Sequence, residues 1–474
     1  MMTTEMTVEE RDFIEEVYSR LDIFLGACQE YHDKAKSCRA VLLLADTEQD
    51  VGKTDPNRKT IQLQTLKSTY NNCVADQMDN MPEALMLPET KKLETVAEDL
   101  TDIVRFVLSH NHYEDLHRKR VEDNFATGTS ITQIVWDPDM DDGEGNIAVL
   151  RWPIESFLWD PKAATLQDAR ALFKTVRYPM SWFEQHYPDK YKQMGSDDFG
   201  SYSQLAKPDA QDGSHVADEE TALLLEYWYR LYDADKRRHT INVAYIAGGV
   251  LLEKAEDVYK HGMYPFVADV FTPIEGVPVG MGMVEELVPM MRYVNRYASY
   301  IDMNLRMASK GRLLVSRNSG IDKDEVADWN TDIIEGDRID PSAIQWLQTQ
   351  PFTGMVNQVM LQMQTDMKQD SGQNQFTRGE TTGGVTAASA ISALQEAGGK
   401  ITRLRTAELN AGFREIVEQI MWLIAQFYDS KRLVFVTGRS GQEGKEVVAD
   451  PKKLFDLGDS DKGRLPPPPY TVQV

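Results

Sequence analysis

Residues 281–309 read MGMVEELVPMMRYVNRYASYIDMNLRMAS, and this stretch decides the fold class. Its apolar residues recur every three or four positions, which predicts one face of a long amphipathic helix. They are Val284, Leu287, Met291, Val294, Ala298, Ile301, Leu305 and Ala308. A second helix is predicted over 353–371, with Val356, Met360, Met363 and Met367 on one face. Between them, residues 311–352 indicate strand, short helix and strand.

Upstream of this stretch the hydrophobic period changes from helical to strand-like. Residues 8–45 and 60–125 have mostly helical periodicity, which prolines at 82 and 88 interrupt. From about residue 126 the period is two, and SITQIVWDPDMDDGEGNIAVLRW predicts a hairpin around an Asp/Gly turn. Further strands are predicted up to residue 254, apart from a polar excursion over 193–220. Helices with mainly antiparallel strands predict an α+β fold.

Downstream, residues 376–399 read FTRGETTGGVTAASAISALQEAGG, a Gly- and Thr-rich loop that runs into a helical pattern. The helix is predicted from about 387 to 428, with a bend at Gly398-Gly399. The final residues Tyr470, Val472 and Val474 alternate as in a strand. A chain that stops in mid-strand suggests a truncated product or an edge that pairs with another chain.

The composition of the chain limits the kinds of function that it can have. The chain has 474 residues, about three domain-sized units, and a formal net charge of -24. A surface this acidic repels nucleic acid and argues against a protein that grips DNA, but it permits one past which DNA slides. Three widely spaced cysteines give no metal ligand pattern and suit a reducing compartment. We expect no signal peptide and no membrane span, and hence an intracellular product.

Four stretches resemble known binding motifs, but each lacks a residue or a spacing that its motif requires. Gly52-Lys53-Thr54 ends like a phosphate-binding loop, but Thr47 stands where the motif needs glycine. The glycines of residues 376–399 do not match dinucleotide spacing. The aspartates at 137, 139 and 141 have calcium-loop spacing but lack the mid-loop glycine and the closing glutamate. The histidines of SHNHYEDLH lack an acidic partner pattern for a metal. We therefore predict no metal, no cofactor and no enzymatic activity.

The order of these parts resembles the portal proteins of tailed double-stranded-DNA phages, particularly the podovirus-type family. The strings VEDNFATGTSITQIVWDPDMDDGEGN, RWPIESFLWDPKAATLQDAR and QFTRGETTGGVTAASAISALQEAG are similar to that family. The resemblance covers about residues 60–430 and rests on the combined strings, because no short motif defines portals.

The resemblance implies a division of the chain and a place in the virion. Residues 1–280 would form the wing, 281–310 and 353–371 the two stem helices, and 311–352 the clip. Residues 372–386 would be the channel loop, and 387–474 the long wing and crown helix with C-terminal strands. Twelve copies would form a ring at one capsid vertex, assembled in the host cytoplasm. Double-stranded DNA would pass through it without specific binding.

The same resemblance implies partners and sites. The partners would be other copies of the chain, the major capsid protein, the terminase large subunit and a head–tail adaptor or tail protein. The terminase, a separate protein, would supply ATP hydrolysis. The expected sites are the channel loop (Phe376, Thr377, Arg378, Thr381 and Thr382), clip docking (Ile344 and Trp346) and stem packing, in which the stem helices of a neighbouring subunit bury the apolar residues (Val284, Leu287, Val294, Ile301, Val356, Met360 and Met363).

Two other readings remain at the level of sequence. A different ring-forming adaptor or scaffold protein would also suit the helical seams and the acidic surface. An ATP-driven nucleic-acid motor is favoured only by Gly52-Lys53-Thr54. For Ile344 and Trp346, a role in the core of the clip itself is nearly as plausible as docking. For the loop, the alternative is a plain connector between helices.

Overall fold

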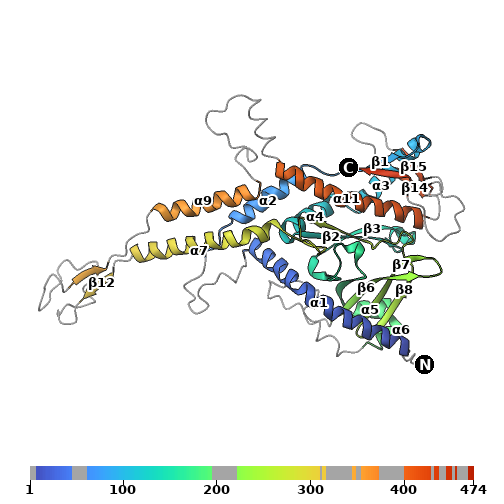
Figure 1. Ribbon diagram of the computed structural model, residues 1–474, viewed down its shortest axis with the longest axis horizontal. Helices are drawn as coiled ribbons and strands as arrows, with labels where there is room; N and C mark the ends of the chain where they lie inside the picture. The colour runs from blue at the N-terminus through green and yellow to red at the C-terminus, as the bar shows by residue number, and fades with distance from the viewer. Residues whose placement is uncertain are drawn as a thin grey trace. The chain divides into compact units, whose positions relative to one another are not determined.

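The computed structural model describes residues 7–44, 61–194, 221–309, 312–315, 344–347, 354–372, 400–428, 432–436, 445–450, 454–455 and 468–474. These residues form the mixture of helices and mainly antiparallel strands that the sequence predicts (Figure 1). The chain divides into two compact units. The first contains Met1–Leu43, Thr69–Glu286 and Gly372–Val474, and the second contains Leu44–Ser68 and Leu287–Ser371.

A five-stranded antiparallel sheet is the largest element of the first unit. Its strand order is β4-β5-β6-β7-β8, and every strand pairs with the next along the chain. The strands are β4 (Phe157–Trp159), β5 (Ala171–Pro179), β6 (Thr221–Asp233), β7 (Arg238–Ala247) and β8 (Val250–Ala255). The alternating runs of the sequence predicted β5 to β8, and this prediction is confirmed. Two short helices, α5 (Met180–His186) and α6 (Pro188–Tyr191), follow β5.

A second, three-stranded sheet has the order β3-β2-β9. The predicted hairpin is confirmed: β2 (Thr129–Asp137) pairs with β3 (Asn146–Trp152), in register from Ile131↔Trp152 to Asp137↔Asn146. The aspartates with calcium-loop spacing lie at its turn, where a short 3-10 segment covers Asp141–Gly143. Strand β9 (Phe266–Val270) completes the sheet, and two-residue strands β10 (Thr272–Pro273) and β11 (Gly280–Met281) pair beyond it.

In the part of the first unit that the structure describes, four long helices cover the sheets. Helix α1 (Val8–Leu42) begins with a capping box between Thr7 and Glu10, and its buried residues recur at helical spacing. Phe24 of this helix meets Phe173 of the five-stranded sheet at 5.5 Å between ring centroids. The others are α3 (Glu94–His110), α4 (Tyr113–Thr127) and α11 (Lys400–Phe427). Helix α11 packs on the three-stranded sheet, mainly on β9 and β2.

Residues 79–93 break the helical pattern where the two prolines predicted an interruption. There β1 (Leu85–Pro88) pairs with β16 (Tyr470–Gln473), the predicted C-terminal strand. The alternation of that strand is confirmed, since Tyr470 and Val472 are buried while Thr471 and Gln473 are exposed. A further pair, β14 (Arg432–Val436) and β15 (Lys445–Ala449), lies beside α3. Strand β1 itself was missed by the sequence reading.

The described residues of the second unit form long helices and one small strand pair. Helix α7 (Met283–Ser309) matches the predicted first helix and keeps Pro289 inside it. Helix α9 (Gly354–Asp370) matches the second, and β12 (Arg312–Val315) pairs antiparallel with β13 (Ile344–Leu347). Helix α2 (Thr65–Met78) begins in this unit and ends in the first. The backbone N–H of Ile61 and of Leu63 donate to Ser299 Oγ and Asn295 Oδ1 of α7, which fixes the chain before α2.

Candidate functional site

Two of the sequence features lie outside the described residues. One is the predicted channel loop with Phe376, Thr377, Arg378, Thr381 and Thr382. The other is the imitation of a phosphate-binding loop that ends at Gly52-Lys53-Thr54. Their roles stay predictions.

The predicted clip residues lie on a described strand. Ile344 is opposite Val315 in the β12–β13 ladder, and Trp346 is opposite Leu313. Since side chains alternate along a strand, Ile344 and Trp346 share one face of this pair. Whether that face binds a partner or the clip core stays a prediction.

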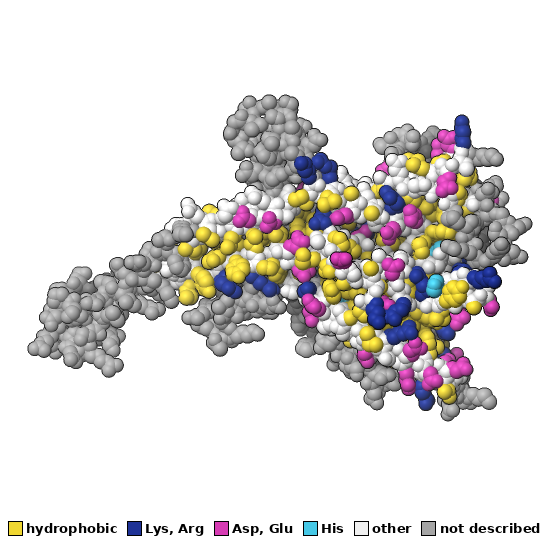
Figure 2. Space-filling view, viewed as in Figure 1, with side chains coloured by type: hydrophobic (Ala, Val, Ile, Leu, Met, Phe, Trp, Pro, Cys, Tyr) yellow, Lys and Arg dark blue, Asp and Glu magenta, His cyan; other side chains and the backbone are white. Residues whose placement is uncertain are grey.

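The predicted stem residues fall into two groups. Val284, Leu287 and Val294 of α7 are almost fully buried within a single chain. The expectation that a neighbouring subunit must cover these three is therefore wrong, because the chain already covers them. The other four are partly exposed: Ile301, Val356, Met360 and Met363. Further apolar side chains on the same two helices are more exposed, namely Tyr293, Tyr300, Met303, Leu305, Val359 and Leu361. Figure 2 shows hydrophobic side chains gathered over α7 and α9.

A buried polar cluster fixes α11 to the rest of the first unit. Arg120 of α4 is 0% exposed and donates to both carboxylate oxygens of Asp269 on β9, at 2.9 and 2.7 Å. It also donates to the Tyr113 hydroxyl and, at 3.5 Å, to the Leu409 carbonyl of α11. A buried guanidinium–carboxylate pair with two hydrogen bonds holds both groups in one orientation.

Glycine at 412 makes this cluster possible. A Cβ added to Gly412 would lie 1.7 Å from Asp269 Oδ1, so only glycine lets α11 approach the carboxylate. Burial raises the pKa of Glu415, one turn further along, and the charge of Asp269 adds to this effect. The cluster therefore joins α4, β9 and α11 through contacts that no other side chain at 412 would permit.

A second set of contacts fixes the start of α11. The Arg405 guanidinium lies 3.6 Å from the centroid of the Phe271 ring and donates to the Phe271 carbonyl and to Glu408 Oε2. The next residue, Thr406, donates its hydroxyl to Gln77 Oε1 at 2.9 Å. The residues that follow the predicted channel loop are thus tied to the first unit by a cation–π contact and hydrogen bonds.

The three histidines of SHNHYEDLH do not converge. His110 lies 3.1 Å from Asp141 at the hairpin turn, and His112 adopts a left-handed conformation (φ 49°) between α3 and α4. His117 is buried beside Arg120, and burial together with that positive charge lowers its pKa to about 3. In the described part of the chain, no group of three or more His, Cys, Asp or Glu residues is arranged to hold a metal.

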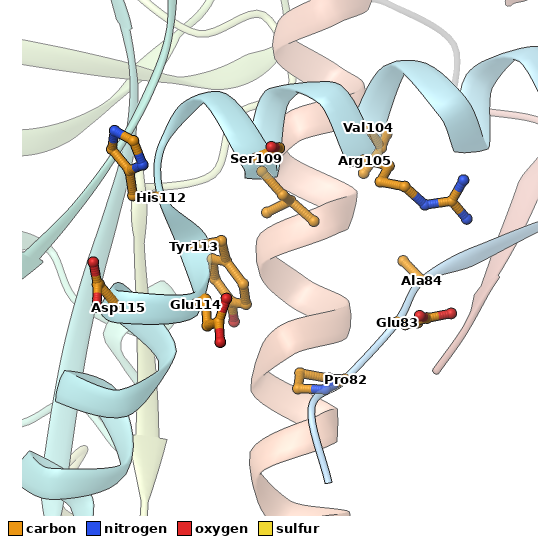
Figure 3. Close-up of a pocket in the computed structure, with 11 residues that line it drawn as sticks. Pro82, Glu83, Ala84, Val104, Arg105, Ser109, His112, Tyr113, Glu114 and Asp115 are labelled. Atoms are coloured by element: carbon orange, nitrogen blue, oxygen red, sulfur yellow. The ribbon is translucent and has the colours of Figure 1, made fainter. Parts of the chain in front are cut away.

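A hollow of about 420 Å³ lies where α3 meets α4 (Figure 3). The extended residues 82–84 form one wall, and the C-terminal half of α3 with the first turn of α4 forms the rest. Its charged side chains are Glu83, Arg105, Glu114 and Asp115. They line an open depression of mixed charge, whose other polar residues are Ser109, His112 and Tyr113.

One family model, described as phage P22-like portal protein, matches residues 29–461. The chain belongs to this portal family. The match extends the resemblance of residues 60–430 in both directions. It indicates a structural protein of a bacteriophage virion, associated with the capsid.

The other comparisons add less. A solved structure described as "Virion of native gene transfer agent (GTA) particle" contains a chain similar to this portal protein. Sequence identity is 9%, the TM-score is 0.38, and the alignment covers 75% of this chain and 77% of that one. At that TM-score the similarity carries no argument. No curated protein sequence matches the portal chain. Among the described helices, none has the length and apolar character needed to cross a membrane.

The residues that hold the portal protein's α11 were not found from the sequence. Arg120 stood within the basic run His117-Arg118-Lys119-Arg120, which gives no sign that one member is fully buried. Asp269 and Gly412 gave no sign either, since neither belongs to a motif. The only available signal was a glycine inside a strongly helical pattern, which often marks close packing.

Proposed function

We propose that this portal protein forms a closed ring at one vertex of the capsid, through which double-stranded DNA enters during packaging and leaves during ejection. The observation that carries the proposal is the family match over residues 29–461. Members of a portal family assemble as rings within the virion and contact capsid and tail components. The acidic balance of the chain, -24, suits a channel that must not hold DNA tightly.

The second unit supplies the proposed docking site for the terminase and the tail adaptor. Helices α7 and α9 lead to and from the segment that carries the β12–β13 pair, which corresponds to the clip. We assign docking to the face shared by Ile344 and Trp346. Support comes from the sequence order of the parts and from the register that places both residues on one face.

The segment 372–386 is the proposed channel loop. Gly372, with φ +84°, lies against Ile401, since a Cβ at Gly372 would meet Ile401 at 3.1 Å. The chain therefore leaves and returns at one place on the first unit, next to the contacts of Arg405. Weak threonine contacts and one arginine per subunit suit a segment that meets passing DNA without binding it.

The test is imaging and mass measurement of the purified protein. We expect rings with a central hole in electron micrographs and a light-scattering mass that is a multiple of 53.8 kDa. A chain that stays monomeric at micromolar concentration would contradict the proposal. Deletion of 377–384 should leave rings intact but impair DNA packaging or retention. Normal packaging by the deletion variant would contradict the assignment of a channel loop.

A further inference from the structure

A groove of about 750 Å³ separates β1 from the first half of α3. One wall is the strand, from which Leu85 and Leu87 project with 49% and 41% of their surfaces exposed. The other wall is helical and carries Glu94, Glu98 and Asp102. Because these acids are spaced by four residues, they form one row along α3. The groove therefore presents two leucines opposite a line of three carboxylates, with Lys91 before the first of them along the chain.

The leucine wall is held rigidly in this orientation. The strand pairs with β16 on one side, where Leu87 is opposite Thr471 and Leu85 is opposite Gln473. On the other side, the Met86 backbone N–H donates to the Thr101 hydroxyl of α3 at 3.1 Å, and the Met86 side chain is buried. Since side chains alternate along a strand, burial of Met86 turns both leucines outward. The exposed pair is a fixed feature of the folded chain.

Two of the three carboxylates have no charge partner on the described part of the chain. Asp102 forms an ion pair with Arg105 at 3.1 Å, whereas no ion pair involves Glu94 or Glu98, and both are exposed. The occupant that this groove fits is a segment with two apolar side chains and two positive charges at helical spacing.

The start of α11 is such a segment. Lys400, Ile401, Arg403 and Leu404 are all exposed, with Ile401 at 45% and Leu404 at 57%. Figure 2 shows the Lys and Arg side chains together at this end of the helix. Positions 400, 403 and 404 share one face of a helix, and Ile401 borders it. This patch is complementary to the groove in both charge and apolar content.

A single chain cannot bring the patch to its own groove. Helix α11 meets the α3–α4 junction at Phe413, whose ring lies 5.2 Å from that of Tyr113. Leu404 precedes Phe413 by nine residues, about 13 Å along the helix axis, and Lys400 lies further away. The contacts of Arg405 and Thr406 fix this end of the helix where it is. The occupant must therefore come from another molecule.

We propose that the start of α11 in one subunit docks into the β1–α3 groove of the next subunit. Leu404 and Ile401 would cover Leu85 and Leu87, while Lys400 and Arg403 would pair with Glu94 and Glu98. The two surfaces differ, so the contact is head-to-tail, which is the type that generates rings. The inference rests on the proposed portal ring and assigns one of its lateral interfaces.

Charge exchange tests the proposal directly. E94K/E98K and K400E/R403E should each weaken ring formation by at least about tenfold in protein concentration, because like charges would then face each other. Combining all four changes should restore assembly, since the pairs are re-formed with reversed sign. The matched control is E9K/D12K on an exposed face of α1, with the same change in charge and no expected effect on rings. Circular dichroism and thermal unfolding confirm that each variant is folded.

Disulfide cross-linking tests the same interface independently of the charge variants. L87C/L404C, with the three native cysteines buried, should give a ladder of disulfide-linked oligomers on mild oxidation, and L87C or L404C alone should not. Normal rings in both charge variants, failed restoration by the combination, or cross-linked monomers without a ladder would each overturn the interface. Those results would leave the portal ring itself standing. Absence of rings in the unaltered protein would instead contradict the proposed function.

Discussion

The two compact units bury their side chains in different ways. In the first unit, two sheets and four helices enclose aromatic residues such as Trp159, Trp228 and Phe413, each at most 2% exposed. In the second, α7 and α9 leave Leu305 and Leu361 more than half exposed, at 58% and 57%. Exposed aliphatic side chains that recur along a helix mark a surface that another chain covers. The first unit completes its own core, whereas the proposed ring would cover the exposed aliphatic side chains of the second.

The two units also differ in their polar contacts. The first unit contains buried charges that are fully partnered, such as Lys174, which pairs with Glu226 at 2.6 Å and lies over the Trp152 ring. Gln133 bonds both members of that pair and so links the two sheets. Such networks define one arrangement of the elements. In the described part of the second unit, the ion pair of Arg306 with Asp302 lies on the surface of α7 and contributes little.

The largest expected effect comes from breaking the Arg120 cluster. R120M should lower the free energy of unfolding by about 3–5 kcal/mol, because Asp269 would stay buried without its partner. Chemical denaturation of the purified protein measures this. The control is R105M, which removes an exposed arginine paired with Asp102 and should change stability by no more than about 0.5 kcal/mol. Equal effects of the two variants would show that the buried cluster does not fix the first unit.

A methyl group at position 412 should have the next largest effect. G412A places a Cβ against Asp269 and should cost about 1–3 kcal/mol through overpacking, although alanine favours helices. G26A is the matched control in α1, since a Cβ there meets nothing within 4 Å. That variant should gain about 0.5–1 kcal/mol. Stabilisation by G412A would contradict the close approach of α11 to β9.

Acidification should weaken the first unit through its buried histidines. Burial lowers the pKa of His117 to about 3, and of His32 and His261 to about 4. The unfolded chain binds these protons below about pH 6.5 but the folded chain does not, so stability falls as pH drops from about 6.5 toward 4. Above that range the histidines are neutral in both states and contribute no pH dependence.

The histidine effect can be isolated by substitution. Each buried histidine contributes a slope of about 1.4 kcal/mol per pH unit in this range. H117Q should therefore flatten the pH dependence of the unfolding midpoint between pH 6.5 and 5. Identical slopes in the wild type and H117Q would exclude this source of acid sensitivity.

The smallest effect on the single chain is expected in the second unit. L305S and L361S should each change the stability of the monomer by no more than about 0.5 kcal/mol, because both side chains already face water. Both should nevertheless reduce the fraction of protein in rings, measured by light scattering. L231S, at a similarly exposed site in β6, is the control and should do neither. Unchanged assembly in the α7 and α9 variants would remove the proposed dependence of the second unit on neighbours.

Periodicity predicted most of the elements, because strands and helices with one buried face leave a regular apolar pattern. The β2–β3 hairpin and helix α7 are the clearest cases, and both match their predicted bounds closely. Strand β1 was missed because a strand of four residues that ends at a proline holds too short a pattern, and its partner lies almost 400 residues away. The β1–α3 groove was missed for the same reason.

The contacts that hold α11 in place could not be predicted from hydrophobic periodicity, for a different reason. Arg120 and Asp269 look like surface residues in any local window, and only the tertiary fold brings them into contact. The stem prediction failed in part because an amphipathic pattern gives the buried face but not the chain that buries it. Val284, Leu287 and Val294 are covered within the chain, while the residues further along α7 are not.

The contact between Gly372 and Ile401 has a consequence for the evolution of residues 373–399, which lie between them in the sequence. The residues that flank the segment 373–399 lie next to each other. The length of this segment can therefore change without moving the helices on either side of it. Doubling the length of such a segment costs only about 0.6 kcal/mol in closure entropy. Insertions, deletions or wholesale exchange between relatives are therefore tolerated by the fold, so this segment can change in evolution while the first unit keeps its structure.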